Sequence, residues 1–167
     1  MKKGIINTDL VNKIREIALL NVEIDSDIHG INHWDAVHEN AIFLSMQDDT
    51  DELVVRLFSY LHDCKRQNDN EDFYHGERAA HLIDKLYEKN GALSVLTFSQ
   101  VEKLRTACFY HNKGTVSTDP TIGACYDADR LELIREGVNV LPFPKLMSTP
   151  MGVMMAKKME NTFRFLT

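Results

Sequence analysis

The chain has 167 residues, of which 44% are hydrophobic, and its formal net charge at pH 7 is -6. The acidic balance argues against an extended nucleic-acid surface and against an anionic membrane as partner, because each would need a cationic footprint. A small-molecule substrate fits this charge better. Three scattered cysteines without CxxC spacing and the lack of a long apolar run predict a cytoplasmic protein.

Apolar residues recur at three-four spacing along the chain, and no β-branched alternation is sustained. This periodicity predicts helices over about 9–20, 33–44, 50–62, 75–89, 99–111, 119–136 and 150–165. Their expected N-terminal caps include Asn7 or Thr8, Thr50, Ser99 and Asp119. The polar run 65–72 is predicted to be an exposed loop. We therefore expect an all-α fold, a single-domain bundle of about six to seven helices over residues 1–167.

The adjacent pair His62-Asp63 is the first candidate for chemistry. It follows the apolar run 57–61, so an imidazole and a carboxylate are expected at the end of a buried helix. Burial of both groups requires a partner, and a metal ion would neutralise the carboxylate and accept a ring nitrogen. Two ligands from one dipeptide are too few, so other helices must contribute.

Three short runs in the order HWDAV (33–37), LHD (61–63) and DADRL (127–131) give the pattern H...HD...D. The chain thereby resembles the histidine-aspartate (HD) superfamily of metal-dependent phosphohydrolases over about residues 29–135. The resemblance implies an HD-like helical domain in which the metal ligands are His33, His62, Asp63 and Asp129. Asp127 is the rival of Asp129, and the two lie about 200° apart on a helix, so both cannot easily face one ion. The Ala-Asp-Arg-Leu match favours Asp129.

Other residues lie where the resemblance suggests supporting roles. His75 and His111 occupy positions where some branches of the superfamily carry extra histidines, which would contact a phosphate or bind a second metal. The alternative for each is a helix cap or a solvated side chain. His29, Lys65 and Arg66 are candidate substrate contacts, and the alternative is exposure to solvent. His38 and His81 lack such a context and are expected to pack or lie on the surface.

A mixed imidazole and carboxylate site suits Mn, Fe, Co, Ni or Zn better than Mg or Ca. The resemblance implies hydrolysis of a nucleotide or other small phosphate ester by metal-activated water. Asp63 would orient that water, and His111 or Lys65 would stabilise the charge on the phosphoryl oxygens.

Three alternatives remain open at this point. With His75 and His111 added, the ligand set resembles the di-iron members of the superfamily that oxidise organic substrates. A binding module without turnover would use the same residues. The methionine-rich last helix could pack on the core or on a second subunit, which would make the protein a homodimer.

Overall fold

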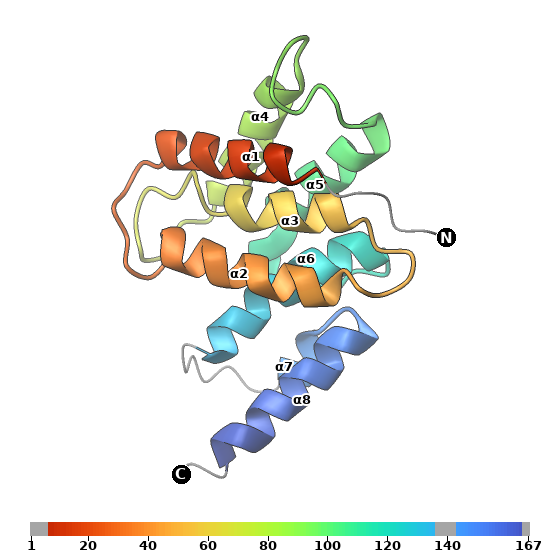
Figure 1. Cartoon of the computed structure of the whole chain (residues 1–167). Helices are drawn as coiled ribbons and strands as arrows, with labels where there is room; N and C mark the ends of the chain where they lie inside the picture. Colours follow the sequence, from red (N-terminus) through yellow and green to blue (C-terminus); the bar gives the residue numbers. More distant parts are fainter. Residues whose placement is uncertain (1–6, 136–142, 165–167) are drawn as a thin grey trace.

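The computed structural model describes residues 7–135 and 143–164, and the regular structure in these ranges is helical (Figure 1). The elements in chain order are α1 (Thr8–Asn21), α2 (Ile31–Leu44), α3 (Glu52–Leu61), α4 (His75–Tyr87), α5 (Phe98–Tyr110), the 3-10 turn η1 (His111–Lys113), α6 (Pro120–Arg135), α7 (Phe143–Leu146) and α8 (Pro150–Arg164). The expected all-α bundle is confirmed. The predicted helix ends at 136 and 165 lie outside the described residues.

α3 is the central helix of the bundle. It contacts α1, α2, α5 and α6, and Figure 1 shows it between α1 and α2. All of its residues from Leu57 to Leu61 are buried, as expected for a helix that is covered on every side. The residues that follow it, His62 and Asp63, are therefore buried, as their position after an apolar run predicted.

Two of the predicted caps form as expected. The Oδ1 atom of Asn7 accepts a hydrogen bond from the backbone N–H of Leu10 at 3.0 Å, at the start of α1. At the start of α6, Oδ1 of Asp119 accepts from the backbone N–H groups of Thr121 and Ile122 at 2.9 and 3.0 Å. Each cap satisfies donors that the first turn of a helix leaves unpaired.

Two other predicted caps were wrong by one or two residues. Asp51, and not Thr50, accepts from the first turn of α3. At α5 the cap is Thr97, and not Ser99, because Thr97 forms a reciprocal capping box with Gln100. A box of this kind satisfies two backbone donors, whereas a serine inside the first turn satisfies none of them.

The segment 65–72 is only partly the exposed loop that its polarity predicted. Arg66 is buried, and its guanidinium donates to the backbone carbonyls of Asn68 and Asn70 at 3.3 and 2.9 Å. Asp72 pairs with Arg78 of α4 at 2.5 Å. The segment folds around its own arginine, so Arg66 and Asp72 are paired, whereas residues 67–71 are exposed.

α4 and α5 approach each other closely at Gly76. A Cβ atom at this position would overlap the carbonyl oxygen of Cys108 and lie 3.0 Å from that of Phe109. Glycine is therefore required for this contact, which brings the start of α4 beside the end of α5. The approach places His75 next to His111.

The segment that contains α7 and α8 packs on α6, as Figure 1 shows in blue. The buried carboxylate of Asp127 accepts hydrogen bonds from the backbone N–H groups of Ser148 and Thr149 and from the Thr149 hydroxyl, at 2.7–2.8 Å. The short helix α7 was not predicted, because prolines interrupt the apolar pattern there. Among the described residues, no helix has the length and hydropathy needed to cross a lipid bilayer.

Candidate metal centre

Three helices bring the first group of candidate ligands together. His33 comes from α2, His62 caps α3 and Asp129 comes from α6. Nε2 of His33 lies 3.3 Å from Nε2 of His62 and 3.3 Å from Oδ1 of Asp129, and Nε2 of His62 lies 3.6 Å from that same oxygen. We call these three residues the first half-site. Their ligand atoms lie close enough together to hold one metal ion.

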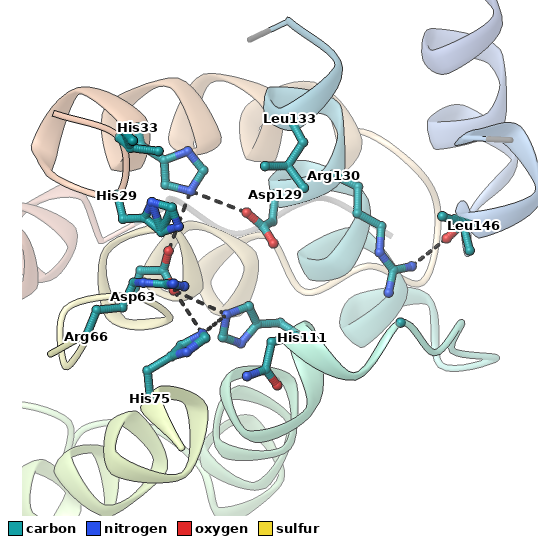
Figure 2. A pocket seen from close by; sticks show the side chains of 13 residues that line it. His29, His33, Asp63, Arg66, His75, His111, Asp129, Arg130, Leu133 and Leu146 are labelled. Carbon is teal, nitrogen blue, oxygen red and sulfur yellow. Dashed lines mark hydrogen bonds and ion pairs between the residues drawn. The ribbon is translucent and has the colours of Figure 1, made fainter. Parts of the chain in front are cut away.

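Asp63 lies between this group and a second pair of histidines, as Figure 2 shows. Its Oδ2 atom lies 3.9 Å from Nε2 of His33 and 3.7 Å from Nε2 of His62. Its Oδ1 atom lies 3.1 Å from Nε2 of His75 and 3.3 Å from Nε2 of His111, and these two nitrogens are 2.9 Å apart. We call His75 and His111 the second half-site. One carboxylate thus faces both half-sites, one oxygen to each.

Backbone carbonyls orient three of these four imidazoles. Nδ1 of each ring lies within hydrogen-bond distance of a carbonyl, at 2.5–3.2 Å, and the carbonyls belong to Phe58 and Ser59 for His62, Asp72 for His75 and Cys108 for His111. Because a carbonyl can only accept, the ring proton sits on Nδ1, and the Nε2 lone pair points at the cluster. Histidines that bind metals are commonly oriented in this way.

The cluster contains two buried carboxylates, which favour a positive charge beside them. Burial alone would raise the pKa of Asp63, but His62 and the histidines of the second half-site outweigh it and hold that pKa well below its usual range. Burial also opposes ionisation of Asp129, and the neighbouring imidazoles of His33 and His62 nevertheless lower its pKa. Two carboxylates therefore remain ionised inside the protein, where an uncompensated charge is costly.

The imidazoles respond to the same charges. Burial disfavours a charged His62, yet Asp63 and Asp129 outweigh it and raise the pKa of His62. At His111 burial dominates and lowers the pKa. A neutral His111 presents its Nε2 lone pair to Nε2 of His75, and two lone pairs at 2.9 Å repel unless a cation lies between them. The donor set fits a divalent ion that takes nitrogen and oxygen ligands.

A pocket of about 270 Å³ opens onto both half-sites. It is lined by His33, Asp63, His75, His111 and Asp129 of the cluster and by Ile28, His29, Arg66, Asn112, Gly114, Arg130, Leu133 and Leu146 around it. Figure 2 shows the side chains converging on this space. The ligand groups are therefore reachable by a small molecule.

Two of the expected substrate contacts lie in this pocket. Arg66 places Nη1 3.7 Å from Oδ1 of Asp63. His29 places its ring centre 6.2 Å from that of His33, and its Nδ1 atom is buried without a hydrogen-bond partner. Burial lowers the pKa of His29, so this imidazole is neutral at neutral pH. A neutral imidazole and a fixed guanidinium can both bind an anionic oxygen.

Lys65 departs from the expectation of a catalytic or substrate-binding residue, because the structure does not bring it to the pocket. Its Nζ atom lies 2.5 Å from Oε1 of Glu23 and donates to the carbonyl of Asn21 at the end of α1. The next side chain along the chain, Arg66, does line the pocket. Adjacency to His62-Asp63 in sequence therefore did not predict adjacency in space.

The remaining expectations concern Asp127 and two histidines. Asp129 points into the cluster, whereas Asp127 faces the segment before α8 and is a structural acceptor. The ring of His38 is tilted against that of Tyr60, with the ring centres 5.1 Å apart, and His81 is exposed. Neither histidine lines the pocket.

Six residues line the pocket that were not predicted from the sequence as site residues: Ile28, Asn112, Gly114, Arg130, Leu133 and Leu146. Leu133 could have been found, because it follows Asp129 by one helical turn on the same face. Leu146 carries no such signal.

Comparisons with known proteins add no further constraint. No family model matches the chain, and no curated protein or solved structure matches it.

Proposed function

We propose that the protein is a metal-dependent phosphohydrolase that hydrolyses a small phosphate ester. The observation that carries the proposal is the position of the Asp63 carboxylate, which faces His33 and His62 with one oxygen and His75 and His111 with the other. A shared carboxylate between two histidine groups suits two adjacent metal ions, an arrangement used for displacement at phosphorus. The resemblance to the HD superfamily implies the same chemistry.

The residues divide into two sets of ligands under this proposal. The first metal would be held by His33, His62, Asp63 and Asp129, and the second by Asp63, His75 and His111. Imidazole nitrogens mixed with carboxylate oxygens favour Mn, Fe, Co, Ni or Zn. When bound, such ions supply polarisation of a phosphoryl oxygen and hydroxide formed from water near neutral pH.

The rest of the pocket would bind and orient the ester. The Arg66 guanidinium is held by two backbone carbonyls of its own segment, so little side-chain freedom is lost when it meets a phosphoryl oxygen. His29 lines the same space, and its Nδ1 atom has no hydrogen-bond partner and lies 3.9 Å from Oδ1 of Asp69. The Asp63 carboxylate lies between the two half-sites, where it would orient the attacking water. His111 would act on the phosphoryl group only as a ligand of the second metal ion, because its Nε2 lone pair faces the cluster and its ring proton is held by the Cys108 carbonyl.

The experiment is elemental analysis together with a hydrolysis screen on the purified full chain. We expect divalent transition metal in the wild type and release of phosphate from small phosphomonoesters. A His62→Ala, Asp63→Ala double variant should lose metal and turnover together while it remains helical. His38→Ala, which removes a histidine of α2 outside the cluster, is the matched control and should keep both. Reconstituted wild type without metal, or a metal-loaded protein that cleaves no phosphate ester, would overturn the proposal.

A second candidate function is favoured by the same six residues. The resemblance to di-iron HD proteins suggests oxidation of an organic substrate by dioxygen, and this requires the second half-site, which the structure does assemble beside Asp63. The metal count separates the two functions. Two irons per chain with oxygen uptake would favour oxidation, whereas phosphate release supported by Mn, Co, Ni or Zn would favour hydrolysis.

A further inference from the structure

The pocket has two chemically different sides. His29 and Arg66 lie on one side of the cluster, and Leu133 and Leu146 lie on the other, beyond Asp129 (Figure 2). The first side can bind an anionic oxygen. The second side is also lined by Arg130, but both terminal nitrogens of its guanidinium already donate to the carbonyls of Leu146 and Thr115. This side adjoins the first half-site directly because Leu133 follows Asp129 by one turn of α6.

The position of Leu146 is fixed by Arg130. The buried guanidinium of Arg130 donates to the carbonyl oxygen of Leu146 and, through its other terminal nitrogen, to that of Thr115 at 2.5 Å. It also lies over the ring of Tyr126 at 5.3 Å. Arg130 therefore joins the last residue of α7 to α6 and to the segment after η1, so it serves the wall and not the phosphate.

The chain just after Leu146 is held as firmly. Asp127 accepts from the backbone of Ser148 and Thr149 and from the Thr149 hydroxyl. A Cβ atom at Gly152 would overlap the Asp127 carboxylate, so α8 begins in close contact with α6. A wall that is held in place before a ligand arrives loses little conformational entropy on binding.

We propose that Leu133 and Leu146 form the specificity wall of the pocket and receive a compact apolar group of the substrate, such as an aryl or short alkyl group. The proposal rests on the proposed function for the anionic end, which lies at the half-sites and Arg66. A pocket of about 270 Å³ is slightly smaller than the range of roughly 300–1,000 Å³ typical of ligand sites. The substrate class is therefore a small phosphomonoester whose organic part is apolar.

The test compares the binding of two phosphonates to the manganese-loaded full chain by calorimetry. We expect phenylphosphonate to bind at least about tenfold more tightly than methylphosphonate, because the ring buries more apolar surface. Leu146→Asn should weaken the binding of phenylphosphonate by about tenfold and change the affinity for methylphosphonate by less than about twofold. Met154→Asn alters an exposed side chain of α8 and should change neither affinity.

A second variant protects the test against misfolding. Leu133→Ala removes the other member of the wall without adding a polar group, and it should lower the preference for the phenyl ligand in the same direction. Equal affinity of the wild type for both phosphonates would overturn the proposal. So would variants that remain helical and weaken the binding of both ligands equally, because the wall should contact a phenyl ring far more than a single methyl group.

Benzoate and acetate distinguish this inference from the proposed function. A preference for benzoate that Leu146→Asn removes, in a protein that hydrolyses no phosphate ester, would support the wall and overturn the phosphohydrolase. Hydrolysis of aryl phosphates and of small polar phosphate esters at equal rates would support the phosphohydrolase and overturn the specificity wall.

Discussion

Replacement of Gly76 by alanine should perturb the second half-site and leave the first half-site unchanged. An added Cβ would overlap the Cys108 carbonyl oxygen and lie 3.0 Å from that of Phe109, and both obstacles are backbone atoms of α5 that cannot rotate away. α4 must therefore move away from α5. His75 is the first residue of α4 and His111 directly follows α5, so their Nε2 atoms, which are 2.9 Å apart, should separate with these helices.

Two opposing effects determine the change in stability. Alanine is favoured over glycine in a helix by at most about 1 kcal/mol. Forcing an extra carbon into a packed contact costs about 1–3 kcal/mol. With the full gain subtracted, we expect the free energy of unfolding to fall by up to about 2 kcal/mol. Each kcal/mol corresponds to a fall in Tm of about 2–4 °C in a chain of this size. The sign is opposite to the one that helix propensity alone predicts.

The assay combines thermal unfolding with elemental analysis of the metal-reconstituted protein. Gly76→Ala should lose the metal of the second half-site and keep that of the first, which is formed by α2, α3 and α6. His81→Ala, on the exposed face of α4, is the control and should leave both the metal count and Tm unchanged. A Gly76→Ala protein as stable as wild type with its full metal content would refute the packing argument and the dependence of the second half-site on it.

Three further predictions concern polar contacts elsewhere in the fold. Asp119→Ala should cost about 1 kcal/mol of stability through the lost α6 cap. Burial opposes ionisation of Asp119, but Lys103 and the backbone N–H groups of α6 outweigh it and lower its pKa. The stability lost in Asp119→Ala should therefore reach its full value above the unfolded pKa of about 4 and should vanish as the pH falls through the folded pKa. Chemical denaturation of both proteins at several pH values measures this. Asp127→Ala leaves buried donors of the segment before α8 unpaired, so urea unfolding should show a loss of about 1–3 kcal/mol or more. Lys65→Ala breaks only the contacts at the end of α1, so metal content should stay unchanged and stability should fall by at most about 1 kcal/mol.

The helices were predictable because burial repeats with the helical period. α3 is the clearest case, since its apolar residues and the acidic first turn that begins with Glu52 indicate both its existence and its start. Caps were less predictable, because several adjacent residues can accept the same hydrogen bonds. Ser99 and Thr97 are both suitable caps, and the reciprocal bond from Gln100 decides between them.

The candidate ligands were predictable from order along the chain, but their distances were not. The first half-site joins residues 33, 62 and 129, and only the packing of three helices sets their separation. The second half-site was harder still, because it depends on a close approach at Gly76 that a single glycine in a helix start does not announce. Leu146 belongs to a short helix between prolines, and nothing in its neighbourhood in sequence links it to Asp129.

The two half-sites differ in how they are attached to the fold, and this difference has consequences for function. The first half-site is formed by helices that share the central core, so its geometry changes only if that core changes. The second lies where α4 begins after the segment 65–72, and the Nδ1 atom of His75 is held by a carbonyl of that segment, Asp72. Occupancy of the second position should therefore depend on this segment and on Gly76, while the first position is retained. A variant that replaces Asp63 cannot show this, because its carboxylate serves both positions. Gly76→Ala leaves every ligand residue in place, so it tests whether the two metal positions are separable.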